Sequence, residues 1–396
     1  MWRYYAYHAT TSYGFWVPVG ILYLSVARGY GFGVIGLAQS AFLLASVVAD
    51  VPAGYLADRA GRRVTLAVGN GLTAVVMALY VVVGSGRAYV ALFALWGVAW
   101  ACHSAIGDAW LYELLDERFE ESQFARVKGR AETVELVVSA GAAVLAGLLY
   151  AVDPALPFVA NAVLAAGGLP LLVSLPAADR PADAVVSVRA TLSVLRTQAG
   201  RPEVRWLVVY AALFNALFSL TRWLEQPSLS AVGVPVAGLG LLYAGFKLVS
   251  AGAMTTTGWI DDRLGPRRFF GLLIPVCGLA YLSIAALPLA VLPVIVLRRV
   301  VDRVSGPIRN QYLNDRIDGV GRATILSGAS MTLSLASGLS NAVVGQVVEA
   351  TGPLAFLPWA GGGVAVAAGL LWLLTDPVRE SPPASDGADG RATPSD

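Results

Sequence analysis

The stretch GYLADRAGRR at residues 54–63 returns in altered form as GWIDDRLGPRR at residues 258–268. Five residues match between the two copies: Gly54, Asp58, Arg59, Gly61 and Arg63 correspond to Gly258, Asp262, Arg263, Gly265 and Arg267. Positions 54 and 258 lie 204 residues apart in a chain of 396 residues. A charged turn that recurs at this distance indicates that the chain is built from two repeated halves.

The composition shows which solvent surrounds these halves. Hydrophobic residues make up 57% of the chain and charged residues only 14%, whereas soluble domains carry about 25% charged residues. Apolar runs such as VTLAVGNGLTAVVMALYVVVGS at residues 64–85 reach the length of roughly 20 residues that a membrane-spanning helix needs. They lack the alternation of a barrel strand, so we predict an all-α membrane protein.

Two further classes of protein are disfavoured. The formal net charge is +2, which offers no basic excess for binding nucleic acid. The chain has two cysteines, Cys102 and Cys277, each inside an apolar run, and this number excludes a disulfide framework. The N-terminal apolar stretch runs on at full spanning length without a small-residue cleavage site, so we do not expect it to be a cleaved signal.

Twelve spans are expected, in two pseudo-symmetric bundles of six helices. The first bundle covers residues 1–176, with spans near 5–27, 34–56, 64–84, 88–113, 130–151 and 155–176. The second covers residues 205–375, with spans near 205–226, 233–257, 268–287, 289–313, 323–348 and 353–375. The polar segment 177–204 is expected to be a cytoplasmic linker with a surface helix at 185–196, and residues 376–396 a disordered cytoplasmic tail.

The basic residues set the expected orientation. Most of the 28 lysines and arginines fall in segments on the side of the N-terminus, and cytoplasmic loops carry such an excess. Both termini and both copies of the repeated turn are therefore expected on the cytoplasmic side of the plasma membrane.

These features resemble the major facilitator superfamily. The pattern G-x-x-x-D-R-x-G-x-[RK]-[RK] between spans 2 and 3, with a degenerate copy between spans 8 and 9, is similar to the signature loop of that family. The segment 104–130 also resembles the fourth-span region of members grouped with drug exporters. The resemblance implies a monomeric transporter of a small molecule, surrounded by membrane lipids, with protons as the coupling ion and without a cofactor. Many drug–proton antiporters of that family carry a glycine-proline motif in span 5. Here span 5 reads SAGAAVLAGLL at residues 139–149 and contains no proline.

The same resemblance implies that the repeated turn is a conformational latch between the two halves. The glycines suit tight turns and close helix packing, the aspartates can accept hydrogen bonds from helix N-terminal amides, and the arginines can pair with carboxylates or lipid phosphates. The alternative is a set of positive-inside anchors, which explains Arg62 and Arg63 but not the repeated aspartate and glycines. Asp50, one turn before Gly54, is expected to support the latch.

Charged residues inside spans are costly and usually face a cavity or each other. In the fold implied by the resemblance, spans 1, 4, 7 and 10 line the central cavity, and the charges concentrate there. The candidates for the substrate cavity are Trp16, His103, Trp110, Arg222, Glu225, Lys247, Arg298, Arg299 and Arg303. Two interpretations of the arginines of span 10 remain open: a structural network that gates the cytoplasmic side, or contact with an anionic group of the substrate.

A proton-coupled carrier needs a group whose protonation depends on which side is open. Asp108 is the first candidate, because its pairing can change as the cavity opens, and Asp302, Glu135 and Glu113 follow. His8 and His103 can titrate near neutrality or serve as satisfied polar histidines. No metal site is expected from two histidines.

The run Gly31, Gly33 and Gly36 matches G-x-G-x-x-G, but it joins two membrane helices rather than following a strand. The chain has no phosphate-binding G-x-x-x-x-G-K-[ST] loop, so ATP is not the expected energy source. We therefore expect a secondary transporter that exports a small amphipathic solute against protons. The alternatives are a symporter or uniporter for an organic anion, and a transporter-like sensor without net flux. An integral-membrane enzyme is disfavoured, because no catalytic constellation is apparent.

Overall fold

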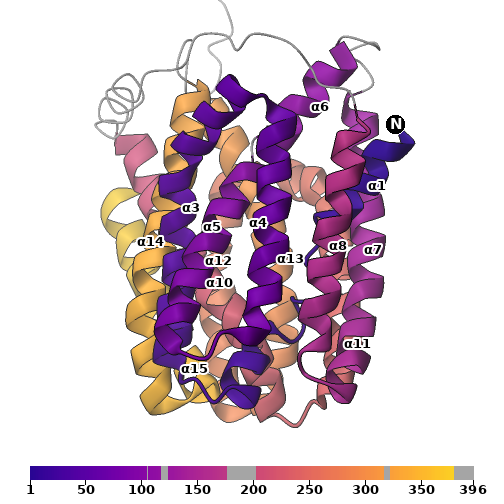
Figure 1. The fold of residues 1–396 in the computed structure, drawn as a ribbon. Coiled ribbons are helices and arrows are strands. Elements are labelled where there is room, and N and C mark those ends of the chain that lie inside the picture. The colour runs from indigo at the N-terminus through magenta and orange to yellow at the C-terminus, as the bar shows by residue number, and fades with distance from the viewer. Residues whose placement is uncertain (105, 117–123, 176–201, 316–321, 379–396) are drawn as a thin grey trace, which may run out of the picture.

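The computed structural model describes residues 1–104, 106–116, 124–175, 202–315 and 322–378. This part of the chain is helical and contains no strand, and its long helices run side by side through the whole bundle (Figure 1). Ten of its helical segments are long and apolar enough to cross a membrane. The predicted all-α membrane class is therefore confirmed. The expected linker helix and most of the expected tail lie outside the described residues.

Ten of the predicted spans each correspond to one long helix whose ends lie within a few residues of the prediction. In the ninth span the helix also includes residues before the turn at Gly265, which interrupts it. In the first half these long helices are α3 (Phe32–Ala60), α4 (Arg62–Val82), α7 (Phe124–Val152) and α8 (Leu156–Val173). In the second half they are α10 (Pro202–Ala231), α11 (Val236–Thr255), α12 (Thr257–Ala286), α13 (Val291–Asn314), α14 (Arg322–Thr351) and α15 (Pro353–Thr375). Helix α13 is not among the ten apolar candidates, as its charged sequence implies.

The first predicted span is not one continuous helix, and this corrects the expectation for residues 5–27. Helix α1 (Trp2–Thr10) is followed by an irregular stretch, the short helix α2 (Gly20–Leu22) and the π-helical turn η1 (Tyr23–Ala27). Pro18 lies in the irregular stretch, where it has no N–H to donate and its ring opposes a continuous helix. The break exposes backbone groups that need partners from elsewhere in the protein.

The fourth predicted span is also divided. It consists of α5 (Gly86–His103) and α6 (Ile106–Asp116), and the backbone at Ser104 leaves the helical region with φ −60° and ψ −122°. The break places the first turn of α6, which contains Asp108, apart from the continuous part of the span.

The two halves have the same internal packing. In the N half (residues 1–175), α1 packs against α7 and α8, α3 against α5, and α4 against α5 and α8. In the C half (residues 202–378), α10 packs against α14 and α15, α11 against α13, and α12 against α13 and α15. Each pairing in one half has its counterpart at the equivalent spans of the other. Between the halves, α3 packs along α14 and α7 along α11, which are also equivalent pairs.

The repeated loops turn on single glycines. Gly61 separates α3 from α4 with φ +93°, and Gly265 interrupts α12 with φ +66°. Residues with a Cβ rarely adopt these angles, so both turns require glycine. We call the end of the bundle that carries these turns the motif end; the N-terminus lies there as well (Figure 1).

The arginines of the two loops make equivalent contacts within their own halves. Arg63 donates to the carbonyl of Leu175 at 2.7 Å, and Arg267 pairs with Asp376 at 3.2 Å, so each joins the start of a third span to the end of a sixth span. The guanidinium of Arg59 lies over the ring of Tyr55, and that of Arg263 over the ring of Trp259. Each of the four contacts lies within a single half, so they stabilise the motif end of each half separately.

Two expectations for the loops are corrected. Methyl groups at Gly54 or Gly258 would meet no atom within 4 Å, so these glycines do not permit close helix packing in this conformation. The neighbouring helices simply do not approach them. The second expectation was that the aspartates accept hydrogen bonds from amides at a helix N-terminus. Asp58 and Asp262 are instead exposed, and no side chain caps the start of α4. Asp50 is exposed as well, and Arg62 is partly buried.

Candidate functional site

At the end opposite to the motif end, side chains cross between the halves and hold them together. Gln226, buried on α10, accepts hydrogen bonds from the backbone amides of Ile21 and Leu22 at 2.8 and 2.9 Å. Its amide nitrogen donates to the carbonyl of Val17 at 2.7 Å. One side chain of the C half thus satisfies three backbone groups that the break in the first span leaves without helical partners. We call this the closed end.

A second crossing contact lies where α3 begins. The carboxylate of Glu349 on α14 accepts a hydrogen bond from the amide of Gly33 at 3.0 Å, a favourable place for a negative charge at a helix N-terminus. A methyl group at Gly31 would lie 2.3 Å from this carboxylate, and one at Gly36 would lie 2.7 Å from Cα of Gly345. The glycine run that imitates a nucleotide motif therefore lets α14 approach α3.

Towards the motif end, each half carries a pocket. The N pocket, about 300 Å³, is lined by Tyr4, Tyr7, His8, Thr11, Leu66, His103, Ser104, Gly107, Asp108, Trp110, Lys128 and Glu132. The C pocket, about 190 Å³, is lined by Tyr210, Ala211, Phe214, Asn215, Phe218, Phe270, Leu273, Asp302, Ser305, Gly306, Arg309 and Leu333. Both pockets combine aromatic walls with a few charged groups, as ligand sites do.

The N pocket has an aromatic floor and charged walls. Trp110 is fully buried and packs against the rings of Tyr4 and Tyr7. Asp108 pairs with Lys128 of α7, which also lies 3.9 Å from Glu132. The Asp108 side chain is 58% exposed, so its charge faces the open pocket. Sequence reasoning missed Lys128, because it lies only a few residues inside a helix that follows a loop.

His103 has hydrogen-bond acceptors at both ring nitrogens. Its Nε2 lies 2.6 Å from Oδ1 of Asn70 and its Nδ1 lies 3.2 Å from the carbonyl of Ala99. The Asn70 amide nitrogen donates to the carbonyl of Ala165 at 3.0 Å, which fixes the amide so that its oxygen faces the imidazole. His103 is therefore held in place by residues of the N half, at the edge of the N pocket.

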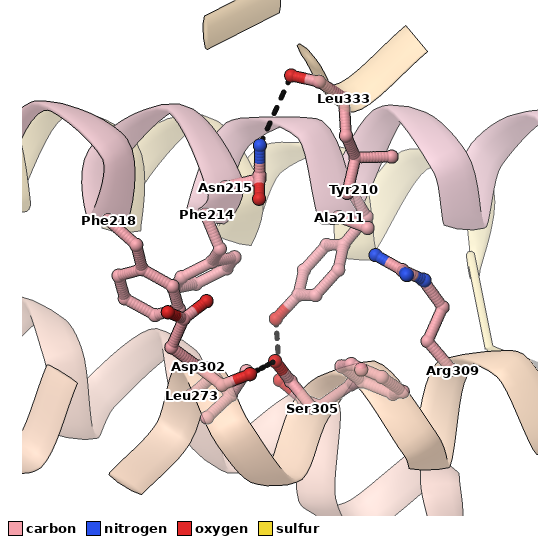
Figure 2. A pocket seen from close by; sticks show the side chains of 12 residues that line it. Tyr210, Ala211, Phe214, Asn215, Phe218, Leu273, Asp302, Ser305, Arg309 and Leu333 are labelled. Atoms are coloured by element: carbon pink, nitrogen blue, oxygen red, sulfur yellow. Dashed lines mark hydrogen bonds between the residues drawn. The ribbon is translucent and has the colours of Figure 1, made fainter. Parts of the chain in front are cut away.

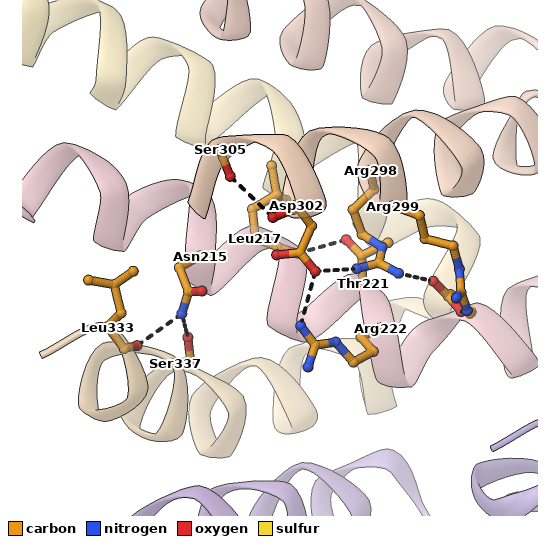
Figure 3. A network of polar contacts seen from close by, with 11 residues as sticks. Asn215, Leu217, Thr221, Arg222, Arg298, Arg299, Asp302, Ser305, Leu333 and Ser337 are labelled. Carbon is orange, nitrogen blue, oxygen red and sulfur yellow. Dashed lines mark hydrogen bonds and ion pairs between the residues drawn. The ribbon is translucent and has the colours of Figure 1, made fainter. Parts of the chain in front are cut away.

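A buried ion cluster lies beside the C pocket. Glu225 on α10 is fully buried and accepts from Arg298 at 2.5 Å and from Arg299 at 2.6 Å, both on α13 (Figure 3). Arg299 also lies over the rings of Tyr243 and Phe246. Arg298 is only 2% exposed. Both arginines therefore pair with a carboxylate of their own half and not with Asp108, although the Nε–H of each has no hydrogen-bond partner within the described residues.

Asp302 joins this cluster to the C pocket. Its carboxylate lies 3.6 Å from Arg298 and 3.4 Å from Arg222, whose side chain is 62% exposed (Figure 3). Figure 2 shows Asp302 and Arg309 projecting from α13 towards the face of α10 that carries the aromatic side chains of the C pocket. Asn215 donates to the carbonyl of Leu333 and to the hydroxyl of Ser337, joining α10 to α14.

The remaining candidates lie elsewhere. Trp16 packs among the rings of Tyr80, Phe93 and Trp96 and lines neither pocket. Lys247 on α11 donates to the hydroxyl of Ser139 on α7 at 2.5 Å, which ties the halves together.

Two further charged candidates, Arg303 and Glu135, line neither pocket. Arg303 is exposed on α13, and Glu135 is partly buried on α7. The side chain of Glu113 lies outside the described residues.

Comparisons with known proteins agree with this architecture. A profile of the Major Facilitator Superfamily matches residues 5–298. The uncharacterized MFS-type transporter YxaM of Bacillus subtilis is 21% identical over 86% of each chain. The probable nitrate/nitrite antiporter NarK1 of Thermus thermophilus is 24% identical over 68% of this chain and 63% of its own. The crystal structure of the nucleoside transporter NupG superposes with a TM-score of 0.78 at 13% identity and covers 96% of this chain and 98% of its own.

Proposed function

This chain belongs to the Major Facilitator Superfamily of membrane transporters, and on that premise we propose that it moves a small organic solute by alternating access. The observation that carries the proposal is the difference between the two ends. Side chains of α10 and α14 hold the halves together at one end, while both pockets lie towards the other. Rocking of the halves about the solute would open the closed end and close the motif end.

The excess of lysine and arginine supports a cytoplasmic motif end in the plasma membrane, with both termini inside. The conformation is then open to the cytoplasm. In the same proposal the repeated loops are latches that engage when the motif end closes, which is consistent with the open space around Gly54 and Gly258 in this conformation. The protein acts as a monomer, because each half supplies one wall of the site.

Proton-driven export is the proposed direction. Asp108 and Glu132 project into an aromatic pocket, and a cationic solute and protons would compete for these carboxylates. Competition of this kind is what exchange requires, because the proton-loaded and solute-loaded forms exclude each other. The pairing of Asp108 with Lys128 supplies a partner that the carboxylate can exchange for a bound cation.

A second candidate is transport of an organic anion, as a symporter or uniporter. The exposed guanidinium of Arg222 and the placement of Arg309 in the C pocket favour it. Neutralising Asp302 with a proton would free positive charge for an anion, so that proton and solute would bind together.

Reconstituted liposomes test the proposal. A pH gradient is imposed, and uptake of cationic, neutral and anionic aromatic compounds is followed for the wild type, Asp108→Asn and Asp153→Asn. Asp153 lies at the closed end, where it caps a turn, so its substitution is the matched control. Exchange through Asp108 predicts that only Asp108→Asn loses uphill movement while downhill movement persists. Undiminished uphill transport by Asp108→Asn would contradict this role, and anion movement alone would favour the second candidate.

A further inference from the structure

The N and C pockets occupy equivalent places in the two halves. Tyr7 and Thr11 line the N pocket, and Ala211 and Asn215, each 204 residues later, line the C pocket. The same offset relates Leu66 to Phe270. Helices α7 and α14, which line the N and C pockets, pack against the other half and approach it closely at Gly147 and Gly345, towards the closed end. The internal repeat therefore relates the two pockets, one in each half.

The wall in the N half has an acidic surplus. Two carboxylates, those of Asp108 and Glu132, line the N pocket together with one lysine, Lys128. The rings of Tyr4 and Trp110 lie beside them, and aromatic faces attract organic cations. Trp110 is fully buried, yet its Nε1–H has no hydrogen-bond partner within the described part of the protein. This wall suits a cationic group on a solute that also carries an acceptor.

The wall in the C half has a basic surplus. Glu225 is shared by Arg298 and Arg299, and Asp302 is shared by Arg298 and Arg222. Two negative carboxylates therefore face three positive arginines in this cluster. Arg309, which lines the C pocket, adds a further positive charge. Among the three arginines, the exposed one is Arg222, at 62%. Guanidinium groups with unused donors bind oxyanions as paired hydrogen bonds.

We infer that the two pockets face each other across one site and that the transported solute is dipolar, with an ammonium group bound at the N pocket, a carboxylate bound by Arg222 and Arg309 beside Asp302 of the C pocket, and an apolar body between the aromatic walls. This inference rests on the proposed transport function and names its class of substrate. Two equivalent pockets of one sign would accept a solute in either orientation. Opposite surpluses of charge fix one orientation, and the solute neutralises both walls when the halves close on it.

Binding to the purified protein in detergent micelles tests the inference without any gradient. Two matched sets of probes differ in the separation of their charges: phenylalanine with 2-phenylethylamine and 3-phenylpropionate, and 4-(aminomethyl)benzoate with benzylamine and benzoate. In at least one set the dipolar probe should bind at least tenfold more tightly than both singly charged probes. Equal affinities within both sets, or failure of all six compounds to bind, would overturn the inference.

Variants assign the two ends of the probe. Asp108→Asn should weaken the dipolar and amine probes about tenfold and leave the acid probe unchanged, whereas Arg222→Gln should weaken the dipolar and acid probes and Arg222→Lys should restore part of the loss. Thermal unfolding of each variant shows that it is folded. An equal loss for all probes in both variants would instead indicate that the opposite charges only pair with each other when the motif end closes, and would overturn the inference.

Flux and binding separate this inference from the proposed function. Selective binding of dipolar probes with no flux in liposomes would contradict transport and retain the dipolar site. Flux of singly charged solutes without preference for dipolar ones would retain transport and contradict the inference.

Discussion

The closed end depends on one side chain, and its removal should open that end. In Gln226→Leu, the amides of Ile21 and Leu22 and the carbonyl of Val17 lose their partners while the closed end remains dry. A buried backbone group without a partner costs about 1–3 kcal/mol. With the lower limit of about 1 kcal/mol for each of the three groups, the closed conformation is destabilised by about 3 kcal/mol relative to an open conformation in which water reaches these groups. That energy shifts the equilibrium between closed and open roughly a hundredfold.

Spin labels can measure this shift. Val82 and Leu287 are exposed residues at the closed ends of equivalent helices in the two halves. Both native cysteines are buried, so cysteines introduced at these positions are the ones that react. Double electron–electron resonance spectroscopy measures the distance between the two spin labels. This distance should be longer in most Gln226→Leu molecules than in wild-type molecules.

The control is Thr221→Val. Thr221 is equally buried on α10, but its hydroxyl contacts that of Tyr281 within the C half at 2.8 Å, so its loss should leave the distance between the labels unchanged. A Gln226→Leu protein that folds normally and keeps the wild-type distance distribution would refute the reasoning, because the three hydrogen bonds would then not hold the end closed.

Three further predictions concern stability. Glu225→Gln removes the buried carboxylate shared by Arg298 and the partly buried Arg299 and should cost about 3–5 kcal/mol, measured as loss of folded protein in a thermal or denaturant titration; wild-type stability would show that the cluster is unimportant. Gly61→Ala should cost about 1–3 kcal/mol because of its positive φ, whereas Gly54→Ala, in open space within a helix, should be neutral or stabilising by up to about 1 kcal/mol; equal effects would contradict the role of the turn. Arg267→Ala breaks a half-exposed pair and should cost less than about 1 kcal/mol, an effect that added salt should reduce further.

The fold was predictable because its signals are long and repeated. Apolar runs define the spans to within a few residues, and the recurrence of the 54–63 turn justified including the charged helix α13 among them. The glycine turns also followed from the sequence, since a one-residue reversal between helices requires a positive φ. The break in the first span had a visible signal in Pro18, but the run of apolar and aromatic residues around it resembled a continuous helix.

The site was less predictable because it depends on which helix faces which. The charges of span 10 were visible, yet the pairing of Arg298 and Arg299 with Glu225 depends on the rotation of α10 against α13. The same is true of Lys128 beside Asp108. The three backbone partners of Gln226 exist only because the first span is broken, so no spacing in the sequence could reveal them.

Alternating access is most directly tested by measuring both ends of the same protein. One pair of spin labels at Tyr55 and Trp259, which are exposed at the motif end, and a second pair at Val82 and Leu287 report the two openings. In liposomes, changes of pH and of transported solute should lengthen one distance as they shorten the other. Distances that rise and fall together, or that stay fixed under every condition that supports transport, would contradict the account.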